Sequence, residues 1–397
     1  MAHQNNANNT SLTWGGVNAN KGTPDATSTV QRRNLYLKLF SGELFKGFQR
    51  NTIARDLITK RTLKNGRSMQ FIFTGRTNSE FHVPGQNILG NTDGAPPVAE
   101  VTIECDDLLI SSAFVYELDE TLAHYDLRGE ISRKIGYALA ENYDRRIFRA
   151  VTKAARQASP IQKTNFLEPG GTQIRVGNNA AGTDAYVADS LINAFYDAAA
   201  ALDEKGVSTE GRVGVLNPRQ YYELIQAVGT NGLVNRDVQG DALQSGNGVI
   251  EIAGIKIYKS MNIPFFGRFG TKYGGSGATG TGVTDPGNTG TFVSEDMGNQ
   301  ANLADDAAPA GGQRTVNDYG EGNKFDNSCG LIFQKEAVGC VEAIGPQVQV
   351  TSGDVSVIYQ GDVILGRLAM GAAPLNPAAA VELIAGIAPN TGVAQPF

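Results

Sequence analysis

The sequence predicts an α+β protein, and three observations support that prediction. Apolar residues follow a helical repeat over residues 118–158. Two segments within residues 67–105 alternate between apolar and polar side chains, which is the two-residue period of a half-buried strand. Beyond residue 209 the patterns become short and mix strand-like with helical spacing. Long helices followed by short mixed elements indicate α+β.

The chain begins with two segments of different character. Residues 1–29 are rich in Asn, Thr and Gly and predict a flexible start. Residues 34–50 place Leu and Phe at mixed helical spacings, which predicts a short amphipathic helix. Such a helix needs a partner to cover its apolar face.

Residues 67–105 predict a long β-hairpin. RSMQFIF and VAEVTIEC supply the two alternating strands, and PGQNILGNTDGAPP between them is full of turn residues. Because an isolated two-stranded hairpin is marginal in water, we expect this one to lie on its own body or on another subunit.

Residues 118–158 give the strongest helical pattern. Asp119 and Glu120 lie in the first turn, whereas five Lys or Arg residues occupy the last part, as the helix dipole favours. Ser159-Pro160 predicts the end of the helix. Gly129 and Gly136 each cost about 1 kcal/mol relative to Ala inside a helix and indicate a kink or a close backbone contact.

The later elements are shorter. We expect a helix over 186–204 that closes at Gly206, a strand over 213–216, and a helix that Asn217 caps. Residues 249–260 predict two short strands around Gly254. Residues 330–343 predict a strand and then a short helical turn, and residues 347–371 predict further strands.

Residues 264–330 interrupt this pattern. They hold 15 Gly in 67 residues and few aliphatic side chains, so they cannot build a core of their own. We expect a long surface insertion, either exposed or ordered by its neighbours.

Composition excludes several classes of protein. Charged residues are 19% of the 397 residues, which is too few for a disordered charged tail protein. No apolar run approaches about 20 residues, so we expect no membrane span. The N-terminus does not resemble a signal peptide. Three cysteines without a CxxC pattern fit a reducing compartment, and three histidines leave little for a histidine-based enzyme.

The charge is distributed unevenly. Residues 30–76 carry eleven Lys or Arg and two acids, a net charge of +9, whereas residues 77–397 carry −15 and the whole chain −6. A basic segment beside an acidic body can dock on an acidic neighbour of the same kind, form a solvated linker, or contact nucleic-acid phosphates. The hydrophobic runs within it favour docking.

No motif predicts catalysis, a cofactor or a metal. GSGATG at 275–280 matches GxGxxG but lacks the preceding strand and following helix that dinucleotide binding requires. Glu120, His124 and Asp126 are near one another on the long helix, where surface hydrogen bonding is the favoured interpretation. Asp354 and Asp362 fit turns better than an acid pair. Cys329 and Cys340 fit buried structural thiols better than a redox pair.

Seven stretches, taken together and in order, resemble one protein family. They are LYLKLFSGELFKGFQRNT (35–52), GRTNSEFHVPGQNI (75–88), YELDETLAHYDLRGEISRKIGYALA (116–140), VGVLNPRQYYELI (213–225), IAGIKIYKSMNIP (252–264), FQKEAVGCVEA (333–343) and RLAMGAAPLNPAAAV (367–381). The chain resembles the major capsid proteins of tailed phages with the Hong Kong 97 (HK97) fold. Within them it is most similar to the short-tailed, autographivirus-like podophages, cyanophages included.

This resemblance implies a domain organisation. Residues 1–57 would form the N-terminal arm, and residues 58–106 would form the extended loop (E-loop) that lies over a neighbour. Residues 107–208 and 346–397 would form the peripheral domain with spine helix 118–158. Residues 209–345 would form the axial domain, which carries the insertion 264–330.

The resemblance also implies function. The family self-assembles as hexamers and pentamers, with a scaffolding protein and a portal protein at one vertex, into an icosahedral head around packaged double-stranded DNA. Contact with that DNA would be weak and non-specific, and assembly would occur in the bacterial cytoplasm. No catalysis, cofactor or membrane contact is implied. Alternatives are a nanocompartment shell of the same fold, or another virion part such as a decoration or tail protein.

The expected inter-subunit contacts lie in the E-loop and the basic arm. The candidates are Arg76, Glu80, Pro84 and Gly85 in the loop, and Arg32, Arg33, Arg50 and Arg55 in the arm.

Overall fold

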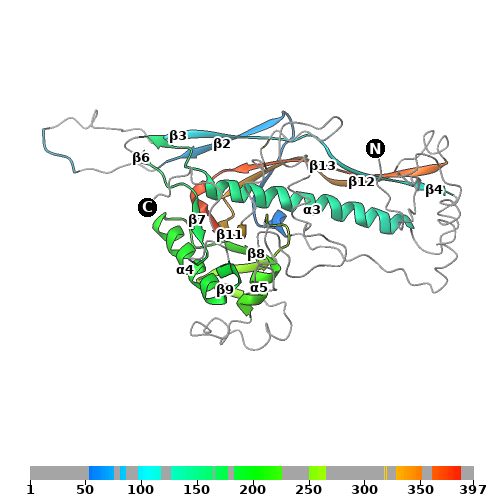
Figure 1. Cartoon of the computed structure of the whole chain (residues 1–397). Helices are drawn as coiled ribbons and strands as arrows, with labels where there is room; N and C mark the ends of the chain where they lie inside the picture. Colours follow the sequence, from blue (N-terminus) through cyan, green and yellow to red (C-terminus); the bar gives the residue numbers. More distant parts are fainter. Residues whose placement is uncertain are drawn as a thin grey trace, which may run out of the picture. The chain divides into compact units, whose positions relative to one another are not determined.

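The computed structural model describes residues 53–75, 81–85, 97–117, 127–163, 166–177, 183–225, 250–264, 317, 319, 328–350 and 360–385 (Figure 1). The chain divides into two compact units. Of the described residues, the first unit comprises 108–117, 127–142, 344–350 and 360–369, and the second comprises the others. The combination of helices with several separate sheets confirms the α+β class.

The helices and strands have the following bounds. The α-helices are α3 (Leu127–Arg156), α4 (Ala188–Glu204) and α5 (Pro218–Ile225), and the 3-10 helices are η1 (Ala54–Asp56), η2 (Thr183–Tyr186) and η5 (Pro377–Ala379). The strands are β1 (Thr59–Thr62), β2 (Ser68–Thr74), β3 (Val98–Glu104), β4 (Leu109–Tyr116), β5 (Gln162–Lys163), β6 (Phe166–Leu167), β7 (Thr172–Arg175), β8 (Arg212–Leu216), β9 (Ile250–Ile252), β10 (Ile255–Lys259), β11 (Ser328–Gln334), β12 (Val338–Val350), β13 (Gly361–Pro374) and β14 (Ala380–Ile384).

The strands form four sheets in the described part of the chain. Their orders are β7-β14-β11-β8-β10-β9, β1-β12-β13-β4, β2-β3 and β5-β6. Strands β12 and β13, like helix α3, contribute residues to both units.

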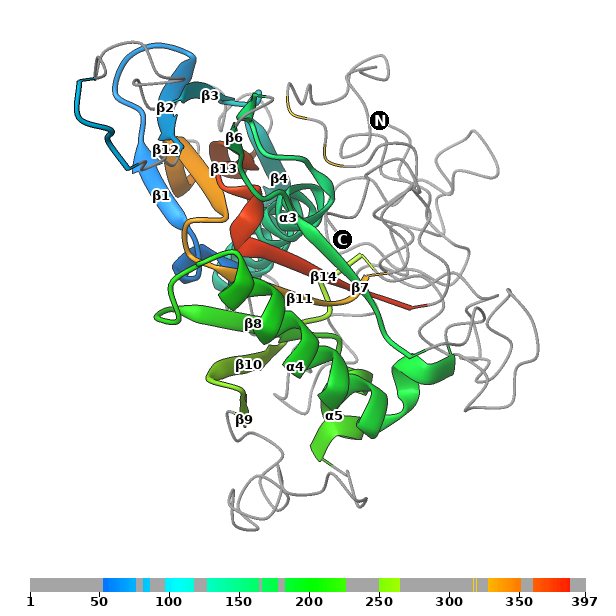
Figure 2. The ribbon, with the colours of Figure 1, turned by 90° about the vertical axis from the view of Figure 1, so that its left-hand side faces the viewer.

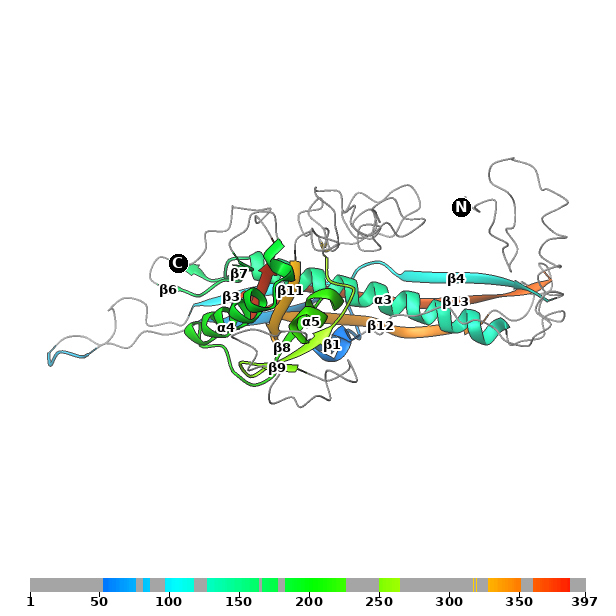
Figure 3. The same ribbon diagram turned by 60° about the horizontal axis from the view of Figure 1, so that its bottom comes forward.

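In the first unit, β4 and β13 form an antiparallel ladder, and α3 packs on it (Figure 3). Gly366 of β13 provides the close approach. A Cβ atom there would lie 2.4 Å from Ile135 and 2.8 Å from Leu139 of α3. Both helical side chains are buried, as their spacing predicts.

In the second unit, α4 and α5 cover one face of the six-stranded sheet (Figure 2). Phe195 and Leu202 of α4 meet Ile332 and Leu383 of the central strands in one apolar cluster. Helix α4 ends at Glu204, and Gly206, whose φ is +71°, closes it as predicted. The Gly206 amide donates to Asp203 O and the Val207 amide to Leu202 O, which is a Schellman motif.

The predicted hairpin is confirmed. Strands β2 and β3 pair antiparallel from Ser68 opposite Glu104 to Thr74 opposite Val98, and they form a two-stranded sheet of their own. The predicted pair of short strands around Gly254 is confirmed as β9 and β10, which a two-residue turn connects.

One local prediction is wrong, and a second is confirmed in position but not in its side-chain contact. Residues 338–343 form the start of β12 and not a helical turn. Residues 338–342 are buried on both faces, so the apolar run carries no alternation that separates strand from helix. Asn217 occupies the N-cap position, since Tyr221 N donates to its carbonyl oxygen. Its side chain, however, donates to Ser328 O and Cys329 O of the adjacent strand instead of capping α5.

The described part of the long helix matches its prediction at the C-terminal end. Residues 118–126 lie outside the described part, so the predicted start at 118 stays a prediction, whereas α3 ends at Arg156 close to the predicted end. Of the two alternatives predicted at Gly136, the close backbone contact is absent, because a Cβ atom there would meet nothing within 4 Å among the described residues, and the kink stays a prediction. The amphipathic helix expected over residues 34–50 lies outside the described residues.

The expected surface insertion is narrower than predicted. Ser328, Cys329 and Gly330 belong to β11 and are buried, and so is Pro264. Tyr319 is also buried, with 1% of its surface exposed, so one part of this segment belongs to the core.

Candidate assembly surface and buried ion-pair networks

The β2–β3 hairpin exposes apolar side chains that the described part of its own chain leaves uncovered. Ile72 is 75% exposed and Val98 is 61% exposed, on the same face of the ribbon. At the described part of its tip, Phe81 is fully exposed and Val83 is 55% exposed. The opposite face, with Met69, Phe71 and Phe73, is only half-buried. Apolar side chains gathered on an exposed ribbon are typical of an interaction surface.

Three of the eight predicted contact residues fall within the described part of the chain. Pro84 and Gly85 are exposed and lie in a turn, with Gly85 at φ +90°. Arg55 is about half exposed and pairs with Glu342 of its own chain at 3.0 Å. The other five, Arg32, Arg33, Arg50, Arg76 and Glu80, lie outside the described residues.

The Arg55 pair belongs to a network that fixes the start of the described chain. Arg55 donates to both carboxylate oxygens of Glu342, at 3.2 and 3.0 Å, and the Tyr143 hydroxyl donates to the same carboxylate at 2.8 Å. The Asp144 carboxylate accepts from the Ile53 and Ala54 amides, at 2.9 and 3.1 Å. Helix α3 thereby holds the segment around η1.

Two pKa values follow from this network. Burial alone would raise the pKa of Glu342, but the hydrogen bonds from Arg55 and Tyr143 and the Arg55 charge outweigh it and lower the pKa. Burial, together with Cys340 and Glu342, raises the pKa of the Tyr143 hydroxyl far above its ordinary value. Glu342 is therefore held ionised and Tyr143 neutral.

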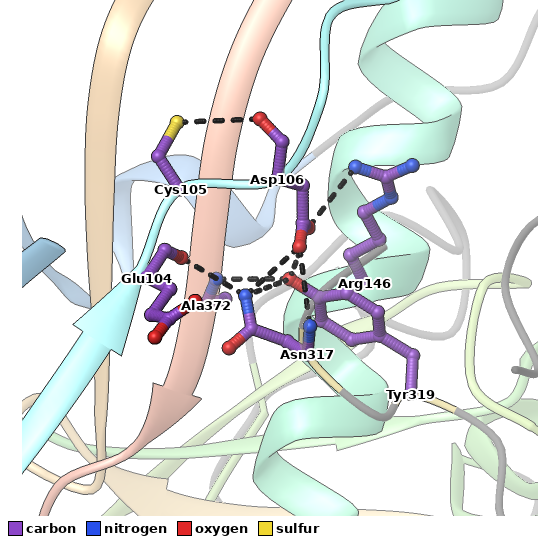
Figure 4. Close-up of polar contacts among 7 residues, drawn as sticks. All are labelled: Glu104, Cys105, Asp106, Arg146, Asn317, Tyr319 and Ala372. Carbon is purple, nitrogen blue, oxygen red and sulfur yellow. Dashed lines mark hydrogen bonds and ion pairs between the residues drawn. The ribbon is translucent and has the colours of Figure 1, made fainter. Parts of the chain in front are cut away.

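A second network surrounds Asp106, directly after β3 (Figure 4). The Asp106 carboxylate accepts from Tyr319 Oη at 2.8 Å, from Asn317 Nδ2 at 3.0 Å and from Asn317 N at 3.3 Å. Arg146 of α3 adds an ion pair at 3.4 Å, and its guanidinium lies 5.6 Å from the centre of the Tyr319 ring. Burial, together with Asp106, raises the pKa of the Tyr319 hydroxyl. The side chains of Arg146 and Asp106 are 2% and 0% exposed.

A third network ties α3 to the six-stranded sheet. Arg156 donates through Nε and Nη2 to the two carboxylate oxygens of Glu382, at 2.6 Å each. Gln173 Nε2 donates to Glu382 at 2.9 Å, and Ser328 Oγ donates to it as well. Glu382 is fully buried in β14. This carboxylate therefore joins α3, β7, β11 and β14.

Sequence reasoning missed these networks for an identifiable reason. The arginines of α3 were interpreted through the helix dipole, whereas Arg146, Arg149 and Arg156 are buried. Their partners Asp106, Tyr319 and Glu382 are distant in sequence, and nothing in the spacing connects them. The one available signal was the run of arginines on a helix that also carries a full apolar stripe, because such a helix has little surface left for solvated charges.

A cavity of about 300 Å³ lies at the loop-side end of β2, where Thr74 pairs with Val98. Thr74 and Gly75 line it together with Glu168, Lys205 and Asn376. The Lys205 amine donates to Gly170 O at 2.6 Å and to Thr172 Oγ1. Burial lowers the pKa of Lys205 to about 8.

This pKa predicts a stability difference that depends on pH. The unfolded Lys205 amine keeps its proton up to its ordinary pKa of 10.5, whereas the folded amine loses it at about 8. Between these values the unfolded state binds more protons, so the contribution of Lys205 to stability increases with pH. We expect the urea midpoint of the wild type to rise relative to Lys205→Met from pH 8 to pH 10. A difference that is flat or falls over this range would contradict the assignment.

Some of the remaining motif residues lie in the described part of the chain, and the others lie outside it. Asp362 lies in β13, paired with Val115, so its interpretation as a turn residue is wrong. Cys105, Cys329 and Cys340 are all buried free thiols, which confirms the structural interpretation of Cys329 and Cys340. GSGATG (275–280), Glu120, His124, Asp126 and Asp354 lie outside the described residues. Within the described residues, no group of three His, Cys, Asp or Glu side chains could hold a metal ion. No helix of that part is long and apolar enough to cross a membrane.

Comparison with known proteins gives a consistent result. The model of the Gp10A-like major capsid protein family matches residues 71–301, more than half of the chain. The major capsid protein of Escherichia phage T7 is 26% identical over 376 residues, which cover 93% of this chain and 96% of the relative. The capsid of cyanophage P-SCSP1u is 29% identical, covers 92% of this chain and 95% of its own, and superposes with a TM-score of 0.65.

A more distant structure shows the fold alone. The mature capsid of bacteriophage PhiM1 is 15% identical, covers 86% of this chain and 90% of its own, and has a TM-score of 0.56. The HK97-like capsid fold and the role as a structural protein of the capsid shell are thereby confirmed. The chain belongs to the Gp10A-like family of phage major capsid proteins.

Proposed function

We propose that this chain assembles as hexamers and pentamers into the icosahedral head of a podophage, around packaged double-stranded DNA. The observation that carries the proposal is the β2–β3 hairpin. It is a two-stranded sheet of its own, and it leaves Ile72, Phe81 and Val98 exposed. Because an obligate assembly buries large apolar interfaces, a neighbouring subunit is the natural cover for such a ribbon.

The hairpin then acts as the E-loop and residues 1–57 act as the N-terminal arm. In this scheme residues 107–208 and 346–397 form the peripheral domain, and residues 209–345 form the axial domain. The segment 30–76 carries a net charge of +9, whereas the rest of the chain carries −15. This charge difference supports head-to-tail docking between copies.

The contacts proposed for this docking are the four loop residues Arg76, Glu80, Pro84 and Gly85 and the four arm residues Arg32, Arg33, Arg50 and Arg55. The exposed turn at Pro84 and Gly85 supports the loop part. Arg55 already pairs with Glu342, so its contribution to a neighbour would come from the exposed half of its side chain.

Further partners belong to the same proposal. A scaffolding protein guides assembly in the host cytoplasm, and a portal protein occupies one vertex. The packaged DNA meets an inner surface that holds it weakly, in keeping with the overall charge of −6. The chain does its work by contact with itself, without catalysis or a cofactor.

Charge reversal in the loop tests the inter-subunit contacts. We expect Arg76→Glu and Glu80→Arg each to reduce the yield of closed shells in negative-stain images, because like charges then oppose across the interface. Circular dichroism and urea unfolding of the unassembled subunits should remain at wild-type values. Normal shell yields from both variants would contradict the proposal, and a loss of subunit folding would assign these residues to the fold instead.

A further inference from the structure

We propose that Asn317 and Tyr319 are positioning residues that fix the root of the β2–β3 hairpin, although they belong to the Gly-rich segment between β10 and β11. The importance of this for assembly rests on the function proposed above. Here the excursion means residues 265–327, the anchor pair means Asn317 and Tyr319, and the hairpin root means Arg67, Glu104, Cys105 and Asp106.

The two residues that flank the excursion meet through a hydrogen bond that does not involve the anchor pair. The Ser328 amide donates to Pro264 O at 3.2 Å, so the chain leaves and returns at one point beside the six-stranded sheet. The contact between Pro264 and Ser328 therefore does not require Asn317 or Tyr319. Their contacts lie instead with β3, α3 and β13, which indicates a separate task.

The anchor pair binds the hairpin root from two directions. Asn317 Nδ2 donates both to Glu104 O, at 3.0 Å, and to the Asp106 carboxylate, at 3.0 Å. The Tyr319 hydroxyl donates to Asp106 at 2.8 Å and accepts from the Ala372 amide at 2.9 Å (Figure 4). One phenol oxygen thus links the end of β3 to β13, and Arg149 holds the Tyr319 carbonyl at 3.1 Å.

At the root, backbone hydrogen bonds join the ribbon to the rest of its unit. The Cys105 amide donates to Arg67 O at 2.8 Å, which ties the two strands together at their base. The Asp106 amide donates to Met370 O at 3.1 Å, which ties that base to β13. Beyond the root, β2 and β3 hydrogen-bond only to each other among the described strands. Asp106 therefore joins the base of the ribbon to β13.

Apart from the anchor pair, the side-chain partner of the Asp106 carboxylate shown in Figure 4 is Arg146. Their N–O distance of 3.4 Å is long for a charge-assisted hydrogen bond, and Arg146 Nε has no hydrogen-bond partner among the described residues. Asn317 and Tyr319 supply the shorter contacts to the carboxylate. They therefore determine how Asp106 is oriented.

Hydrogen–deuterium exchange of the purified full-length protein tests the anchor. We expect Tyr319→Phe to accelerate exchange in the peptide covering 98–106 by about tenfold or more, because the buried carboxylate loses its closest donor. Asn317→Ala, a change at a half-buried side chain, should give the same pattern and serves if Tyr319→Phe folds poorly. Unchanged exchange at 98–106 in both variants would overturn the proposal.

Tyr143→Phe is the matched control. It removes another buried hydroxyl that donates to a carboxylate, that of Glu342, at the same 2.8 Å. Its effect should appear mainly at the Leu63 amide, which donates to Glu342 O at 2.8 Å, and should accelerate exchange at 98–106 much less than Tyr319→Phe does. Equal acceleration at 98–106 in Tyr143→Phe and Tyr319→Phe would show that any loss of a buried hydroxyl has this effect, and it would overturn the proposal.

Two deletions separate the anchor from the rest of the excursion. Replacing residues 267–313 with a short glycine–serine linker keeps the anchor pair and should leave exchange at 98–106 unchanged. Removing residues 265–327 entirely, with Pro264 joined to Ser328 by a short linker, should accelerate it as Tyr319→Phe does. Equal behaviour of the two deletions would overturn the proposal.

Shell formation distinguishes this proposal from the function on which it rests. We expect Tyr319→Phe to reduce the yield of closed shells several-fold relative to Tyr143→Phe. Wild-type protein that forms no shells would contradict the proposed function, whereas the exchange results would still decide the role of the anchor.

Discussion

Replacing Arg156 with methionine is expected to destabilise the subunit by about 3–5 kcal/mol, because it leaves a buried carboxylate without its cation. Both oxygens of Glu382 accept from Arg156 at 2.6 Å, and the two side chains are 0% and 7% exposed. Glu382 lies in β14, one strand in from the edge of the six-stranded sheet, so the loss reaches several elements. Urea unfolding of the purified subunit measures the change.

Two controls accompany this variant. The double variant Arg156→Met/Glu382→Met removes both charges and should unfold at higher urea concentration than Arg156→Met alone, since no lone buried charge remains. Lys60→Met breaks an exposed pair with Asp56, whose side chain is 91% exposed, and should change stability by less than about 0.5 kcal/mol. An Arg156→Met variant as stable as Lys60→Met would contradict the buried pairing.

Replacing Gly371 with alanine is expected to cost about 3 kcal/mol or more, because the new Cβ atom would meet backbone that cannot rotate away. In the present backbone that atom would lie 1.8 Å from Glu104 O and 3.1 Å from Asn317 Nδ2. Relief of the clash requires β13 to separate from the end of β3. Urea unfolding again measures the loss, and exchange at Asp106 should accelerate because its amide donates to Met370 O.

Gly136→Ala is the matched control for Gly371→Ala. Gly136 lies inside α3, and a Cβ atom there meets nothing within 4 Å in the described structure. Alanine should therefore stabilise the unassembled subunit by up to about 1 kcal/mol, the helix-propensity difference. Equal destabilisation by both substitutions would show that the glycines matter for some reason other than close approach.

The sequence predicted those elements whose signals are local. The two-residue period of β2 and β3 identified the hairpin, since one of its faces is more buried than the other. Helix α4 could be bounded at Gly206, because a Schellman motif needs a residue at positive φ. The resemblance of seven ordered stretches led to the capsid fold, which the comparisons confirm.

The predictions that failed, in whole or in part, concern residues whose contacts lie far away in the sequence. The start of β12 is buried on both faces, so it lacks the alternation by which a strand is recognised. The Asn217 side chain donates to carbonyl groups of β11, a strand more than a hundred residues away in the chain. Tyr319 lies in a segment with too few aliphatic residues to predict any core, yet Asp106 and Ala372 bind its hydroxyl.

The candidate surface shows the same division. The exposed hairpin could be expected from its length, because a ribbon that long cannot be covered by itself. The buried networks around Asp106 and Glu382 could not be, because ion pairs between distant segments leave no periodic trace in the sequence. The domain boundaries and the individual inter-subunit contacts stay predictions.

A cryo-electron microscopy reconstruction of the particles that form when this protein is expressed with its scaffolding protein tests the central claim most directly. The account predicts closed icosahedral shells of hexamers and pentamers in which residues 68–104 of each subunit contact a neighbouring subunit. Fibres, isolated subunits, or shells in which this hairpin contacts only its own chain would contradict it.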